Sequence, residues 1–108
     1  MIVYRLLIAL VYAKSLFANQ ELIRCFELLQ TEFIQNPSFV SLLYAFGKYA
    51  IKAVTLFEDD SINKRIAMGY LGTAIGALEE CSRSQVKERY PRIFYYLAKA
   101  YEKKQLPV

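Results

Sequence analysis

The sequence contains no histidine and no tryptophan, and among its 108 residues there are only two cysteines, four glycines and three prolines. Without histidine, a Ser-His-Asp triad, a Cys–His pair and every histidine-ligated metal site are excluded. Charged residues make up only 22% of the chain and hydrophobic ones 56%, a balance that excludes intrinsic disorder. A chain of this length is expected to form one domain, residues 1–108, with a core that needs no metal or disulfide.

The two cysteines, Cys25 and Cys81, are far apart in the sequence and belong to no C-x-x-C motif. Such isolated cysteines are typical of small apolar side chains in a core, which favours a reducing, cytoplasmic compartment. Secretion is the less favoured alternative. Arg5 and the apolar run Leu6–Ala13 resemble a short signal peptide, but the small-x-small cleavage rule is poorly met. We expect this segment to be an ordinary buried helix instead. The apolar run Ile66–Leu78 is shorter than the roughly 20 residues that a membrane span requires.

Strand signals are missing, because the chain has no alternating β-branched runs and no Asn-Gly or Asp-Gly hairpin turns. Apolar residues instead recur every three or four positions, which predicts helices throughout. We therefore expect an all-α domain with about five helices. Their expected ranges are about Val3–Phe17, Glu21–Ile34, Phe39–Phe57, Ile62–Cys81 and Pro91–Lys104.

Breaks between these helices carry the residue types that start and stop helices. Ser38 follows a proline and is expected to cap the third helix, and Asp60 or Ser61 is expected to cap the fourth. Pro91 suits the first turn of the fifth helix, where its missing N–H is harmless. Pro107 is expected to end that helix.

Three of the expected helices share a core in which a small residue is followed three positions later by tyrosine or alanine. These cores read Ile8-Ala9-x-x-Tyr12, Phe46-Gly47-x-x-Ala50 and Leu97-Ala98-x-x-Tyr101. The small residue, Ala9, Gly47 or Ala98, is expected to let the paired helix approach closely. The pattern resembles the tetratricopeptide repeat (TPR), a helix–turn–helix of about 34 residues, and the segment PRIFYYLAKAYEKKQ matches it best. The resemblance implies an antiparallel helix-hairpin array, a TPR-like α-solenoid. Its fifth helix would be the first half of a repeat, so a fragment of a longer solenoid is one expectation.

In TPR proteins the first helix of each repeat lines a concave groove, and the resemblance transfers that role to particular residues here. Near Ala9 it implies an apolar wall that includes Leu6, Leu10, Ala13 and Lys14. Further along it implies Tyr44, Lys48, Ile51 and Lys52 around Gly47, and Tyr95, Lys99, Glu102 and Lys103 around Ala98, with Arg92 one turn earlier. The predicted partner-binding residues among them are Tyr44, Lys48, Lys52, Arg92, Tyr95, Lys99 and Lys103. The charge distribution agrees, since residues 63–108 carry nine basic and four acidic side chains. Ammonium groups beside tyrosines suit an acidic peptide or a C-terminal carboxylate.

Three glycines, Gly69, Gly72 and Gly76, follow one face of the fourth helix. Because each glycine destabilises a helix by about 1 kcal/mol relative to alanine, we expect a compensating contact. Close packing of two helices within the array is the preferred interpretation. The alternative is a groove that receives a helix of another protein.

No residue pattern pairs a base with a nucleophile, and the acidic turn Glu58-Asp59-Asp60 lacks the spacing of a Ca²⁺ loop. We therefore expect a non-enzymatic adaptor or scaffold with no catalytic residue, metal or cofactor, whose groove binds an acidic or helical partner segment. The alternative is a structural subunit or homo-oligomer that assembles through apolar helix faces. A nucleic-acid-binding domain is less favoured, because Glu88 and Glu102 interrupt the basic residues. Those residues are Arg83, Lys87, Arg89, Arg92, Lys99, Lys103 and Lys104, with Tyr90, Tyr95 and Tyr96 as stacking rings.

Overall fold

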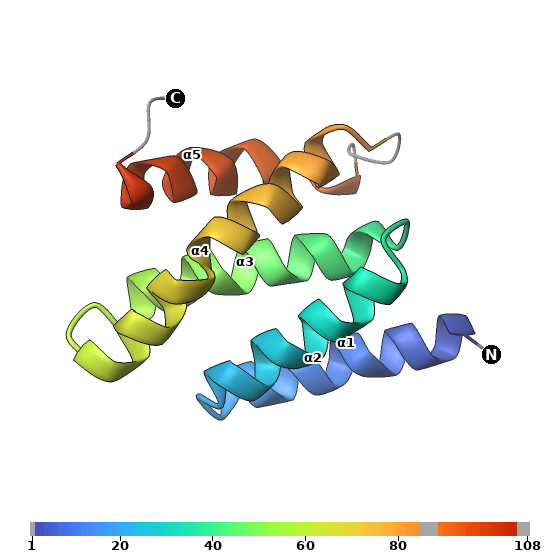
Figure 1. Ribbon diagram of the computed structural model, residues 1–108, viewed down its shortest axis with the longest axis horizontal. Coiled ribbons are helices and arrows are strands. Elements are labelled where there is room, and N and C mark those ends of the chain that lie inside the picture. The colour runs from blue at the N-terminus through green and yellow to red at the C-terminus, as the bar shows by residue number, and fades with distance from the viewer. Residues whose placement is uncertain (1, 85–88, 106–108) are drawn as a thin grey trace.

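The computed structural model describes residues 2–84 and 89–105, which form five helices (Figure 1). Each observed boundary lies within two residues of the expected one, and no strand occurs in the described ranges. The expectation of an all-α fold with five helices is confirmed. The helices are α1 (Ile2–Ala18), α2 (Leu22–Gln35), α3 (Val40–Leu56), α4 (Ser61–Ser82) and α5 (Ile93–Lys104).

The predicted caps are partly correct. Asp60 caps α4, because its carboxylate accepts a hydrogen bond of 3.0 Å from the Asn63 backbone N–H. Ser38 does not cap α3: the chain turns once more, and Phe39 occupies the cap position without a side-chain hydrogen bond. The prediction for Pro91 is also wrong, since α5 begins only at Ile93.

The fifth helix ends at Lys104, before the proline that was expected to end it. Gln105 follows α5 in the left-handed conformation, with φ of 61°, and this terminates the helix. Pro107, the expected terminator, lies outside the described residues. Lys103 and Lys104 occupy the last turn, where their charges favour the negative end of the helix dipole.

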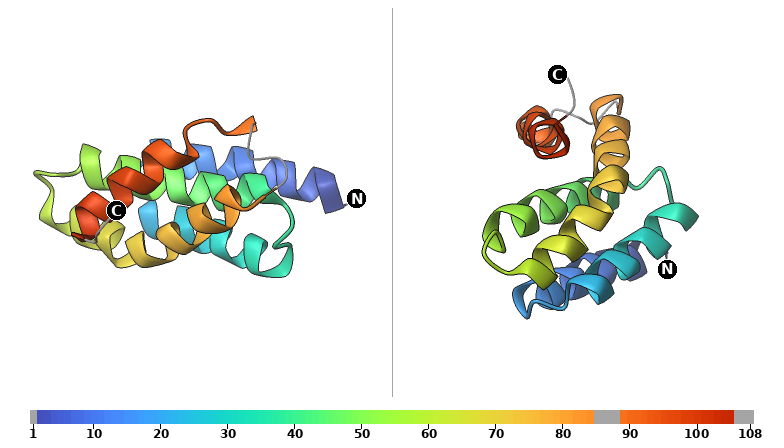
Figure 2. Two further views of the ribbon diagram at one scale, coloured as in Figure 1. Left: turned by 90° about the horizontal axis from the view of Figure 1, so that it is seen from above. Right: turned by 60° about the vertical axis from the view of Figure 1, so that its left-hand side comes forward.

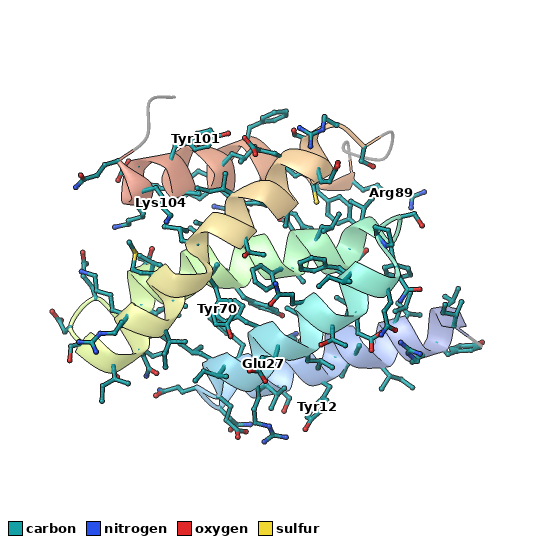
Figure 3. All side chains as sticks on the ribbon, viewed as in Figure 1. Tyr12, Glu27, Tyr70, Arg89, Tyr101 and Lys104 are labelled. Carbon is teal, nitrogen blue, oxygen red and sulfur yellow. The ribbon has the colours of Figure 1, made fainter. Side chains whose placement is uncertain are left out.

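The helices pack mostly against their neighbours in the sequence and form two layers (Figures 1 and 2). One layer contains α1, α3 and α5, and the other contains α2 and α4. Helix α3 is central and contacts all the other helices, with its largest contact on α4. Between α4 and α5, the Tyr101 hydroxyl donates a hydrogen bond of 2.7 Å to Glu79 (Figure 3). No described helix has the length and hydrophobicity needed to cross a bilayer.

Aromatic rings from α2, α3 and α4 form the centre of the core. Phe26 and Phe46 are fully buried, and their ring centroids lie 5.1 Å apart. The Phe46 ring also meets Phe33 at 5.4 Å and Tyr70 at 5.9 Å. A second cluster joins α4 to α5 through Leu71, Leu78 and other apolar side chains. None of the described polar or charged residues is buried, so apolar contact holds the layers together.

Helix α1 differs from its expected environment in two ways. The sequence predicted an ordinary buried helix, but only one side of α1 is buried, and large apolar residues cover its exposed side. Leu6 and Ala13, which the resemblance placed on a groove wall, are instead core residues that are 2% and 0% exposed. They face the adjacent helices because α2 and α3 both pack on that side of α1.

The small residues of the TPR-like cores differ in what they contact. A β-carbon on Gly47 would lie 2.3 Å from Leu78 Cγ, so the close approach predicted there is confirmed. Ala9 is also buried, whereas Ala98 is exposed. The first two therefore serve the packing of α1 and α3, and Ala98 faces solvent.

The packing expected at the glycines of α4 is wrong. A β-carbon at Gly69 or Gly76 would meet no described atom of a packed neighbour within 4 Å, and at Gly72 only the Lys104 ammonium comes within 3.9 Å. All three glycines are exposed. The low helix propensity of these glycines is therefore not offset by close packing against a described helix.

Both cysteines are buried and free, as expected for apolar core residues. Burial raises the thiol pKa of Cys25 and of Cys81 from the ordinary 9.0 to about 12, with a smaller contribution from Glu80 at Cys81. We expect neither thiol to react with Ellman's reagent at pH 8 until the protein is unfolded. Rapid reaction of the folded protein would contradict this packing.

The same pKa shift predicts how stability depends on alkaline pH. Thiols of the unfolded chain ionise near pH 9, whereas those of the folded protein stay protonated up to about pH 12. The folded state therefore binds more protons in this interval, and the free energy of unfolding falls as pH rises from about 9 to about 12. Urea denaturation at pH 7, 8 and 10 measures this effect: the midpoint should be unchanged between the first two and lower at the third.

Candidate functional site

A groove with a volume of about 440 Å³ lies between α3 and α5. Residues on α3 contribute at helical spacing, because Ile51 and Thr55, like Lys52 and Leu56, are one turn apart. Successive turns of α5 form the opposite wall, which begins at Arg92 just before the helix. We call this site the α3/α5 groove; its lining is Ile51, Lys52, Thr55, Leu56, Arg92, Tyr95, Tyr96, Lys99 and Lys103.

Five of the seven residues predicted from the TPR resemblance line this groove together: Lys52, Arg92, Tyr95, Lys99 and Lys103. The sequence analysis missed Thr55, Leu56 and Tyr96 as lining residues. The spacing of four between Lys52 and Leu56 is a signal that could have identified Leu56. Tyr96 is 4% exposed and forms part of the groove floor.

The groove is positively charged, and the described residues that line it include no acid; Glu102, which the resemblance assigned to the groove, is not among them. The groove's four cationic residues come from both walls. Within the described ranges the ion pairs are Arg5–Glu32, Arg24–Glu21 and Arg83–Glu80, none of which involves a groove cation. The groove charges are therefore available to an anionic ligand.

Tyrosine rings position the cations on the α5 side. The Arg92 guanidinium carbon lies 4.7 Å from the Tyr95 ring centroid and 5.5 Å from that of Tyr96. The Lys99 ammonium lies 5.9 Å from the Tyr95 centroid. Cation–π attraction of this kind holds a charged group over an aromatic face while its N–H donors stay free for a ligand.

The remaining two predicted residues, Tyr44 and Lys48, lie beside the groove instead of lining it. The half-buried Tyr44 ring packs against Tyr90 at 4.6 Å and Tyr96 at 6.0 Å, and burial raises its pKa. Tyr44 thus supports the groove floor through Tyr96.

Lys48 extends the positive charge from the groove toward α1. Its ammonium lies 5.1 Å from the Tyr49 ring centroid and 5.7 Å from that of Tyr44. Burial lowers the Lys48 pKa, and the like charges of Lys52 and Lys14 lower it further. The ammonium groups of Lys14 on α1 and of Lys48 and Lys52 on α3 are therefore close enough for their charges to repel one another.

A second, larger cavity has a volume of about 990 Å³ and is lined in part by Gly76, one of the glycines for which the sequence analysis gave a groove as the alternative interpretation. It is bounded by the end of α2, the α2–α3 turn, the start of α3 and α4, and most of its lining is apolar. The spacing of Thr73, Gly76 and Ala77 on α4 is a sequence signal for it. Its two charged lining residues, Glu80 and Arg83, form an ion pair of 3.3 Å. Because the α3/α5 groove holds unbalanced charge, we regard that groove as the candidate functional site despite its smaller volume.

The fold and the groove define a compact all-helical domain of five helices packed in sequence order, with a basic surface between α3 and α5. No protein-family profile, curated protein sequence or solved structure matches this chain.

Proposed function

We propose that the protein is a non-enzymatic adaptor of TPR-like architecture that binds an acidic segment of a partner protein in the α3/α5 groove. The observation that carries the proposal is the placement of four cationic side chains around one groove without a carboxylate. The pairing of each helix with the next, α1 with α2 and α3 with α4, supports a helix-hairpin array.

The chemistry of the groove suits a short acidic peptide with apolar side chains. Lys52 stands on one wall and Lys99 and Lys103 on the other, so a segment lying between α3 and α5 meets cations from both sides. Ile51 and Leu56 offer apolar contacts along the α3 wall. Charge-assisted hydrogen bonds from lysine and arginine to carboxylates are stronger than bonds between neutral groups.

Nucleic acid is a poorer ligand for the same surface. Of the three tyrosines suggested for base stacking, Tyr95 is exposed, but Tyr96 is buried and Tyr90 packs against Tyr44. The Tyr90 hydroxyl also shares a hydrogen bond with Ser41. Arg83 is paired with Glu80, and Lys87 lies outside the described residues. One accessible ring gives a single strand little to stack on.

A charge-reversal experiment tests the proposal. Anisotropy of a fluorescent peptide containing alternating glutamate and leucine should show binding that weakens with added salt. We expect Lys52→Glu with Lys99→Glu to weaken binding at least tenfold, because both changes place repulsive charge inside the groove.

The matched control changes the net charge equally but outside the groove. Arg65 is exposed on α4, and Lys104 approaches Gly72 of α4 instead of the groove. Arg65→Glu with Lys104→Glu should therefore alter the affinity less than threefold. Equal losses in the two double variants, or salt-insensitive binding, would contradict the proposal. Tighter binding of a single-stranded oligonucleotide than of the peptide would favour nucleic acid instead.

A further inference from the structure

Helix α1 is apolar on its exposed side as well as on its buried side. Leu6, Ala9, Ala13 and Leu16 are buried in the core. Seven large apolar residues of α1 are about half or more exposed, among them Ile2 (56%), Val3 (49%) and Tyr12 (46%). We call the four central ones the α1 stripe: Tyr4 (64%), Leu7 (46%), Ile8 (67%) and Val11 (71%). A helix on the surface of a globular protein normally has a polar outer face, so this stripe indicates a surface that is covered in the working protein.

The α1 stripe is uncharged, and the exposed residues Val3 and Tyr12 extend the apolar surface on either side of it. At 3.6 residues per turn its four side chains fall within an arc of about 100° on the helix, a width typical of a surface packed against another helix. The charged residues Arg5 and Lys14 stand on opposite flanks of this arc. No acidic residue occurs in α1.

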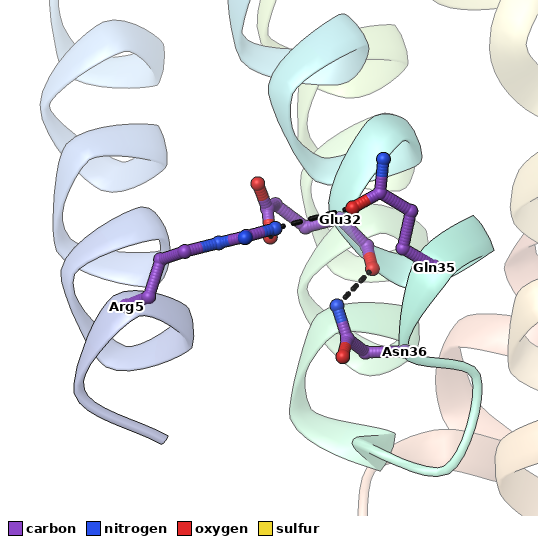
Figure 4. Close-up of polar contacts among 4 residues, drawn as sticks. All are labelled: Arg5, Glu32, Gln35 and Asn36. Carbon is purple, nitrogen blue, oxygen red and sulfur yellow. Dashed lines mark hydrogen bonds and ion pairs between the residues drawn. The ribbon is translucent and has the colours of Figure 1, made fainter. Parts of the chain in front are cut away.

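The two flanking charges differ in their partners. The Arg5 guanidinium extends to α2, where it lies 2.8 Å from Glu32 Oε2 and 3.2 Å from Gln35 Oε1 (Figure 4). Lys14 is exposed and takes part in none of the ion pairs of the described residues. The stripe itself carries no ionic group, and Arg5 at its edge is already paired, so apolar contact is the main interaction that the stripe offers.

We propose that the α1 stripe is covered by the α1 stripe of a second copy, in an antiparallel pair related by a two-fold axis. With the axis between residues 7 and 8, Tyr4 lies opposite Val11 of the second copy, and Leu7 lies opposite its Ile8. All four stripe residues then find apolar partners within the stripe itself, which is the self-complementarity that a two-fold interface requires. In this register Arg5 stands opposite Leu10, so no two cations face each other.

The dimensions of the stripe fit a dimer of modest affinity. Helix α1 has 17 residues and is about 25 Å long. A single helix pair of this length gives an interface at the small end of the range around 800 Å² per partner, so the dimer should dissociate on dilution. Helix α3 separates α1 from α5, so the pair leaves the α3/α5 groove open (Figure 1).

Analytical ultracentrifugation of the 108-residue chain between about 1 and 500 µM tests the dimer. The weight-average mass should rise with concentration from 12.5 kDa toward twice that value. Val11→Glu should keep the protein monomeric throughout, and at about 1 µM, where the unmodified protein is also monomeric, it should leave the thermal midpoint unchanged because Val11 is 71% exposed. The matched control is Ile62→Glu, on an equally exposed apolar residue of α4 (72%), which should still dimerise.

Disulfide trapping tests the register, since the two natural cysteines are buried and unreactive. Oxidation of a Tyr4→Cys protein mixed with a Val11→Cys protein should give the mixed dimer. Tyr4→Cys alone should cross-link poorly, because in the antiparallel pair its two copies are about 10 Å apart along the axis, too far for a disulfide.

Several results would overturn the proposal. A constant mass of 12.5 kDa up to the highest concentration would exclude the dimer, and persistence of the dimer in Val11→Glu would place the interface elsewhere. Efficient self-cross-linking of Tyr4→Cys would require a parallel pair. Co-flotation of the unmodified protein with anionic phospholipid vesicles, lost in Val11→Glu, would identify a membrane as the occupant.

Discussion

Replacing Gly47 by alanine is expected to destabilise the protein by about 2 kcal/mol, although alanine is the better helix former. The added β-carbon would lie 2.3 Å from Leu78 Cγ and 2.5 and 2.8 Å from its two δ-carbons. Leu78 is fully buried, so its side chain has no free space into which to move. Either α3 and α4 separate, or Leu78 adopts a strained rotamer. Urea denaturation of Gly47→Ala measures the loss.

Two other glycines provide the control, since the same substitution should have the opposite sign there. Gly69 and Gly76 are exposed within α4, and a β-carbon at either would meet no described atom of a packed neighbour within 4 Å. Gly69→Ala and Gly76→Ala should each stabilise the protein by up to about 1 kcal/mol through helix propensity alone. If Gly47→Ala also stabilises the protein, the close contact between α3 and α4 does not exist. A Leu78→Ala background should remove the clash and make Gly47→Ala less harmful than in the unmodified protein.

Phe46→Ala is expected to have the largest effect on stability, a loss of about 3–5 kcal/mol. The ring is fully buried and meets aromatic rings from three directions, Phe26, Phe33 and Tyr70. Removing the ring loses the hydrophobic stabilisation of its buried atoms. It also leaves a cavity among α2, α3 and α4, because the packed helices can move only slightly to fill it. Because a domain is stable by only about 5–15 kcal/mol, this loss should populate unfolded chains.

The thermal midpoint provides a direct measurement. Each kcal/mol should lower it by roughly 4–8 °C in a domain of this size, so Phe46→Ala should melt more than about 12 °C below the unmodified protein. Phe94→Ala is the matched control, because that ring is 62% exposed on α5 and its loss should shift the midpoint by only a degree or two. Similar losses in the two variants would show that Phe46 is not at the centre of the core.

Helix positions were predictable because their causes are local. Apolar residues at intervals of three and four, with breaks such as Asn36-Pro37, define the five helices to within two residues. Caps were less predictable. Asp60 binds the Asn63 N–H as expected, but Ser38 and Pro91 lie outside their helices because each turn is longer than its residue types indicate.

The candidate site was predictable in part. Spacing places Lys99 and Lys103 one turn apart on a helix, and the TPR resemblance paired them with Lys52, which lines the same groove. The spacing of residues along one helix does not show which side of that helix packs against a neighbouring helix. Tyr44 therefore packs under Tyr96 and does not line the groove, and of the larger cavity at the α2–α3 turn only the glycine side, at Gly76, corresponds to an alternative that the sequence offered.

The sequence by itself determined the fold class, the helix boundaries, the absence of histidine chemistry and the excess of positive charge in residues 63–108. These properties depend on composition and on neighbours a few residues apart. Only the tertiary structure decided that Gly47 is packed while Gly69 and Gly76 are open, and that the outer side of α1 remains uncovered. It also decided that the groove cations share their lining with no carboxylate of the described residues. The physical reason is that burial and charge neutralisation depend on atoms brought together from distant parts of the chain, and helical periodicity carries no information about them.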